Sequence, residues 1–127
     1  MRFRPNPRTI TLLCAVISFH PAFAISASTS RGQISVAQAR AMLDQAASNP
    51  TARQVLTAYL AGIGETAGTM MDAAGQQACQ RRLSLDDKIA LQALERAAPN
   101  ANLWAETAAT PLILRDMLKR ANCRVAD

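Results

Sequence analysis

The cysteines constrain the fold of this 127-residue chain more than any other feature. Three are present, at positions 14, 79 and 123, but the first lies in an N-terminal stretch that we expect to be removed. Two thiols that remain in an oxidising compartment most simply form one intramolecular disulfide, with an intermolecular bridge as the alternative. A Cys79–Cys123 bond would close a loop of about 45 residues and restrict the unfolded chain.

The N-terminal stretch has the three parts of a secretory signal peptide. It opens with MRFRPNPR, which carries three arginines and no acid, and continues with the apolar run TITLLCAVISF. Ala22-Phe23-Ala24 then provides the small-x-small pattern of a cleavage site, so residues 1–24 are predicted to be the signal. The apolar run is too short to span a bilayer. The sequence therefore predicts an exported, periplasmic protein without a membrane anchor after cleavage near Ala24.

Removal of the signal changes the composition. The single histidine, His20, and all three phenylalanines lie within it. Three of the 14 lysines and arginines are also lost, so that eleven remain against nine acids and the net charge of +5 falls to about +2. Such a small excess differs from the clustered basic surface of a nucleic-acid-binding protein, and we expect no nucleic-acid partner.

Without histidine, the mature chain lacks the usual groups for catalysis or metal binding. A cysteine nucleophile normally relies on a histidine base, and a zinc site needs more ligands than two thiols. Asp86 and Asp87 could be paired catalytic carboxylates, but in the first turn of a predicted helix they interact favourably with its dipole and free amides. We therefore expect no enzyme activity, no catalytic residue, no metal site and no cofactor.

Four segments of the mature chain have the apolar spacing of three and four residues that is typical of amphipathic helices. Each opens with a residue that caps helices or with proline in the first turn. The predicted starts are Ser35 with Gln38, Asn49-Pro50, Ser84 with Asp87, and Thr110-Pro111. The predicted fold is all-α: a small bundle of four main helices with one intramolecular disulfide. This domain is expected over 35–127, after a flexible leader over 25–34.

The second predicted helix carries two further patterns. Ala61, Gly64 and Gly68 are small residues that are expected to let another helix approach closely. Met70 and Met71 are expected to fill the core, because methionine packs adaptably.

The polar segment around Cys79 is the candidate partner-binding surface. Its amide and guanidinium donors belong to Gln76, Gln77, Gln80, Arg81 and Arg82. It has too few apolar residues to form a core, and a disulfide would pre-organise it, which lowers the entropy lost on docking. Arginine is also favoured at interface centres. Trp104 is either a flanking anchor or a core plug. The alternative is that the loop only connects helices and a partner meets a helix face or a dimer groove.

A family resemblance extends over nearly the whole mature chain, from about Val36 to Cys123. It rests on Asn49-Pro50, the Tyr59-x-x-Gly62 step, a cysteine in a polar loop, a third helix that ends before a proline, and a last helix that closes on the second cysteine. In these features the chain resembles the Rap/Tai family of type VI secretion amidase immunity proteins.

The resemblance implies a periplasmic helical protein that binds a cognate peptidoglycan amidase effector and sterically occludes its open cleft. An inhibitor of this kind needs no catalytic group and is often a homodimer. Two alternatives belong to other classes. One is a small periplasmic stress chaperone in which acid exposes apolar surface, and the other is a helical envelope binding module of unknown partner. A neighbouring reading frame that encodes a papain-like amidase would favour the first hypothesis over both.

Overall fold

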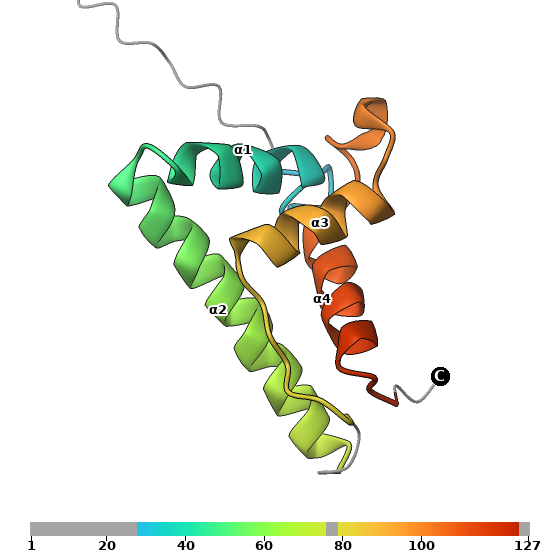
Figure 1. Ribbon diagram of the computed structural model, residues 1–127. Helices are drawn as coiled ribbons and strands as arrows, with labels where there is room; N and C mark the ends of the chain where they lie inside the picture. The colour runs from blue at the N-terminus through green and yellow to red at the C-terminus, as the bar shows by residue number, and fades with distance from the viewer. Residues whose placement is uncertain (1–27, 76–78, 125–127) are drawn as a thin grey trace, which may run out of the picture.

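The computed structural model describes residues 28–75 and 79–124. Within these ranges the chain forms four α-helices and no strand. They are α1 (Val36–Ala46), α2 (Pro50–Ala73), α3 (Asp87–Ala97) and α4 (Ala109–Arg120), with a short 3-10 helix, η1 (Ala101–Leu103), before α4. The long α2 forms one side of the molecule, α1 lies across one of its ends, and α3 and α4 pack together on the inner side (Figure 1). The predicted all-α fold with four main helices is confirmed.

The first two helices begin where the sequence predicts. The Ser35 hydroxyl accepts a hydrogen bond from the Gln38 backbone N–H at 3.0 Å. The Asn49 side chain accepts from two backbone amides of the first turn of α2, and Pro50 follows at the first helical position. These bonds satisfy amides that have no partner within the helix.

The third helix begins later than predicted. Its cap is Asp86, whose carboxylate accepts from the Ile89 backbone N–H at 2.8 Å, and the prediction of a start at Ser84 is wrong. Leu83 and Leu85 alternate along an extended segment and both pack against the core. A helix that started at Ser84 would lose this alternation, because helical side chains repeat every 3.6 residues.

The hydrophobic core lies where the four helices meet. Its largest fully buried apolar side chains come from every helix: Val36, Leu56, Leu94, Ile113 and Met117. The remaining buried positions are mostly alanines, which allow the helix backbones to approach one another closely. None of the helices among the described residues is both long enough and apolar enough to span a membrane.

The segment before α1 is held in place, contrary to the prediction of a flexible leader. Thr29 is 5% exposed, and the Ser30 backbone N–H and hydroxyl donate to the Glu106 carboxylate at 3.1 and 2.8 Å. These bonds lower the pKa of Glu106 below its usual value. The Ala109 N–H donates to the Ile34 carbonyl at 2.9 Å. The prediction is therefore wrong for residues 28–34, whereas 25–27 lie outside the described residues.

The small residues of α2 were predicted to face another helix, but they lie beside an extended segment. The extended segment 79–86 runs back along α2 (Figure 1). Its Leu83 and Leu85 line a hollow together with Gly64. A Cβ atom added at Gly64 or Gly68 would meet nothing within 4 Å. The expected close helix approach is therefore wrong. Met70 is 49% exposed, so it does not fill the core either.

Alanine at these glycines is expected to stabilise the protein. Gly64→Ala and Gly68→Ala should each raise the free energy of unfolding by about 0.5–1 kcal/mol. Glycine in the interior of a helix makes the helix less stable than alanine by about this amount. Urea denaturation of the single variants measures the change. Gly32→Ala is the control, because the φ of +73° at Gly32 disfavours any other residue and should lower stability. A loss of stability in Gly64→Ala would show that this face needs glycine for a contact.

Candidate functional site

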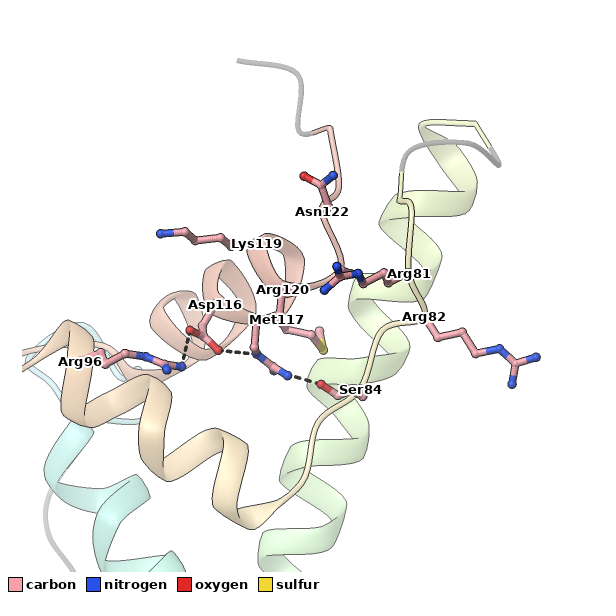
Figure 2. Close-up of a pocket in the computed structure, with 10 residues that line it drawn as sticks. Arg81, Arg82, Ser84, Arg96, Asp116, Met117, Lys119, Arg120 and Asn122 are labelled. Carbon is pink, nitrogen blue, oxygen red and sulfur yellow. Dashed lines mark hydrogen bonds and ion pairs between the residues drawn. The ribbon is translucent and has the colours of Figure 1, made fainter.

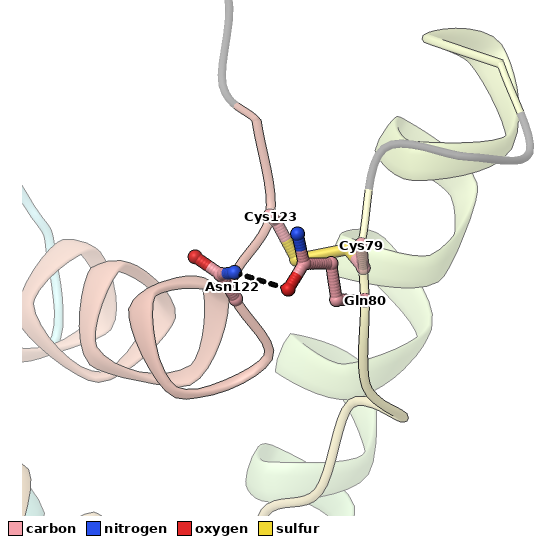
Figure 3. The surroundings of a disulfide bond; sticks show 4 residues. All are labelled: Cys79, Gln80, Asn122 and Cys123. Atoms are coloured by element: carbon pink, nitrogen blue, oxygen red, sulfur yellow. Dashed lines mark hydrogen bonds between the residues drawn. A yellow bond between two sulfur atoms is a disulfide. The ribbon is translucent and has the colours of Figure 1, made fainter.

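The predicted disulfide is present and ties the extended segment to the end of α4 (Figure 3). The sulfur atoms of Cys79 and Cys123 are 2.03 Å apart. The backbone N–H groups of Gln80 and Arg81 both donate to the Ala121 carbonyl, at 3.1 and 3.0 Å. The Asn122 side-chain amide donates to the Gln80 side-chain carbonyl. The described part of the candidate loop is therefore fixed to the turn after α4 by one covalent bond and three hydrogen bonds.

The way in which α4 ends positions Cys123. Asn122 has a left-handed φ of 52°, which asparagine tolerates better than most residues. The Cys123 N–H donates to the Leu118 carbonyl and the Asn122 N–H to the Lys119 carbonyl, at 3.0 and 3.1 Å. These are the two bonds of a Schellman motif, which closes a helix and reverses the chain direction. The motif turns Cys123 toward Cys79.

A basic hollow of about 750 Å³ lies beside this anchor, between the extended segment, α3 and the last turn of α4. The charged side chains that line it are five cations and one acid: Arg81, Arg82, Arg96, Lys119, Arg120 and Asp116 (Figure 2). Residues 81 and 82 come from the predicted loop, and the others come from α3 and α4. We call this feature the basic hollow.

Asp116 neutralises only two of the five cations. Its two carboxylate oxygens accept from Arg96 Nη2 and Arg120 Nε, each at 2.8 Å. Arg120 also donates from Nη2 to the Ser84 carbonyl at 3.1 Å, so its guanidinium is held in one orientation. No acid among the described residues forms an ion pair with the three remaining cations, Arg81, Arg82 and Lys119. The hollow therefore keeps a positive charge that a carboxylate or phosphate could neutralise.

The two neighbouring arginines of the loop point in different directions. Arg81 is turned toward α4, whereas Arg82 extends away from α4 (Figure 2). Both side chains are exposed to solvent. Arg81 is therefore the loop arginine whose side chain faces the cations of α4.

Trp104 does not lie beside this loop. Its indole Nε1 donates to the Ala98 carbonyl at 2.8 Å, and the Arg40 guanidinium stacks 4.5 Å from the ring centroid. Its carbonyl accepts from the Ala37 N–H at 3.2 Å. These contacts join the connection before α4 to α1 and α3, while the loop lies at the other end of α4 (Figure 1). Trp104 therefore serves the packing of the fold, and its predicted place as a flanking anchor of the loop is wrong.

The other predicted loop residues have separate outcomes. Gln76 and Gln77 lie outside the described residues. Gln80 is exposed and bonded to Asn122. Lys119 and Arg120 were not among the predicted site residues, although the predicted disulfide gives the signal that could have found them. A bond to Cys123 brings the preceding helix turn, with its two cations, next to the loop.

The remaining polar side chains with catalytic potential have structural contacts. Asp87 forms an exposed ion pair with Arg53 at 3.8 Å. The Tyr59 hydroxyl lies 3.0 Å from the Thr110 hydroxyl, and burial raises the pKa of Tyr59 above its usual value. In the described part of the chain, no three His, Cys, Asp or Glu side chains are grouped so that they could hold a metal ion. What the site offers is positive charge and N–H donors, which suit recognition of an anionic group.

In comparisons with known proteins, no protein-family model, no curated protein and no solved structure matches this chain significantly.

Proposed function

We propose that this protein is an exported immunity protein that binds a cognate peptidoglycan amidase effector of type VI secretion and blocks its cleft. The observation that supports it best is the basic hollow, in which the anchored loop presents charge that the protein does not neutralise. The disulfide also supports export, because such bonds form and persist in oxidising compartments such as the periplasm. The N-terminal signal pattern supports the same compartment.

The anchoring favours binding in two ways. The loop backbone loses little conformational freedom on docking, because the disulfide and its neighbouring hydrogen bonds already restrict it. The guanidinium of Arg81 offers a planar set of donors that matches a carboxylate. A positive patch also speeds the encounter with an acidic partner and makes it sensitive to salt.

Inhibition by occlusion of a cleft requires no catalytic group in this site. A rigid small domain that covers an active-site cleft excludes the substrate without taking part in chemistry. The charge on Arg81 and on the end of α4 would orient the protein on the effector. A helical envelope module with another acidic partner would use the same hollow, so that the identity of the partner separates the two functions.

Arg81→Ala is expected to weaken inhibition by at least about tenfold, which corresponds to about 1.4 kcal/mol. The neighbouring reading frames are searched for a papain-like amidase, and its product is purified. Its hydrolysis of peptidoglycan is then followed as the protein is titrated. The wild type should inhibit at near-equimolar amounts. Arg31→Ala is the matched control, because it removes the same charge from an exposed residue that does not line the hollow.

Each outcome of this assay has a separate meaning. Circular dichroism should show the same helicity in both variants, since neither arginine is buried. Equal affinity of the Arg81→Ala variant and the wild type would place the contact elsewhere on the protein. An amidase that is untouched by the wild type would contradict the immunity function itself.

A further inference from the structure

An apolar groove lies on the other side of the α4 terminus. It has a volume of about 640 Å³ and separates the end of α2 from α4. Its apolar lining consists of Met70, Pro111, Leu114, Leu118 and Cys123. Met70 is 49% exposed although it is a large apolar residue, so this wall of the groove is open to solvent. We call this feature the apolar groove.

The apolar groove and the basic hollow share a border. Lys119 and Asn122 line both of them, so one bound segment that crosses the end of α4 would reach the two sites. At its other end the apolar groove continues past Leu114 into a smaller hollow of about 360 Å³. There the wall on α2 contains Ala58, Gly62 and Thr66, which precede Met70 at intervals of four residues and therefore lie on the same helix face.

The charge of the apolar groove indicates what can occupy it. Its ionic lining residues are Arg115 and Lys119, and no acid lines it. A second copy of this chain, related by a two-fold axis on this face, would bring these cations against their own counterparts, because such an interface is self-complementary. Like charges brought together in this way oppose association. A partner that carries carboxylates has the opposite, complementary charge.

We propose that the apolar groove receives a large apolar side chain from an acidic segment of the partner, whose carboxylate lies in the basic hollow. The segment crosses the end of α4 over Lys119 and Asn122. Burial of the apolar side chain against Met70, Leu114 and Leu118 adds affinity that charge alone does not give. The proposal rests on the proposed function only in that it needs a protein partner, which need not be an amidase.

Three sets of short peptides test this pairing of an acid with an apolar side chain. The first set contains glutamates and one leucine at varied spacing. In the second set alanine replaces the leucine, and in the third glutamine replaces the glutamates. Labelled peptides are titrated with the full mature protein, and their fluorescence anisotropy is measured at low salt. The best peptide of the first set should bind about tenfold more tightly than its counterpart in either other set.

Two variants of α2 assign the effect to the apolar groove. Met70→Ser should remove the advantage of leucine over alanine, whereas Val55→Ser should keep it. Val55 is the matched control, because it is 51% exposed on the same helix but does not line the groove. Thermal unfolding of both variants confirms that they are folded at the temperature of the titration.

Several results would overturn the proposal. Equal affinity for the leucine and alanine peptides would exclude the apolar groove from the contact. The conclusion of the amidase assay about the proposed function would not change. If no peptide binds, the apolar groove and the basic hollow are both excluded as a joint binding site for such a segment. A wild-type dimer in sedimentation that Met70→Ser dissociates would show that a second copy covers the groove. Conversely, leucine-dependent binding without amidase inhibition would keep this inference and contradict the immunity function.

Discussion

Replacement of both Cys79 and Cys123 by serine is expected to lower the free energy of unfolding by about 4 kcal/mol. The disulfide joins residues 44 positions apart, so that its loss releases a long loop in the unfolded chain. A domain of this size has a total stability of about 5–15 kcal/mol, and the loss would therefore remove a large part of it. Urea denaturation of the oxidised wild type and the double variant measures the difference.

The same wild type denatured in a reducing agent is the control for the cysteine variant. Its stability should match that of the double serine variant, because both lack only the covalent bond. Thiol titration of the denatured, unreduced protein should detect no free thiol in the mature chain. Equal stability of the oxidised protein and the double variant would mean that the closed loop does not restrict the unfolded state.

Leu94→Ala is expected to lower the free energy of unfolding by about 3 kcal/mol. Leu94 is 0% exposed in α3 and belongs to the core where the four helices meet. Truncation loses the transfer free energy of its methyl groups and leaves a cavity that the surrounding helices fill only partly. Urea denaturation followed by circular dichroism measures the change.

Leu103→Ala is the matched control for the core variant. Leu103 is 58% exposed in η1, so the same truncation there should change stability by less than about 0.5 kcal/mol. Similar losses in both variants would show that the cost arises from the leucine side chain in general and not from the burial of Leu94.

The sequence predicts the local features of this fold better than its long-range contacts. The cap residues Ser35 and Asn49 could be recognised because a capping bond reaches only two or three residues along the chain. Ser84 has the same local signature, but the packing of Leu83 and Leu85 against the core outweighs it and keeps the segment extended. Tertiary packing decided this boundary, and a single sequence does not show it.

The candidate site also has one part that the sequence predicts and another that depends on tertiary packing. The pairing of Cys79 with Cys123 could be predicted because only these two cysteines lie outside the predicted signal peptide. The opposite directions of Arg81 and Arg82 could not, because adjacent residues of an extended segment point to opposite sides and the sequence does not say which side faces α4. Lys119 could have been placed beside the loop, because the predicted bond to Cys123 brings the last turn of α4 next to Cys79.

The bonds of the leader determine when the first helix can be completed during synthesis. Ser30 bonds to Glu106, 76 positions later, and the Val36 N–H donates to the Thr107 carbonyl at 2.8 Å. These bonds at the start of α1 therefore cannot form until a segment near the end of the chain has emerged. Contacts of such long sequence separation form late, because the intervening chain must first be brought together. The N-terminal end of the fold is therefore expected to stay open during synthesis until almost all of the chain has been made.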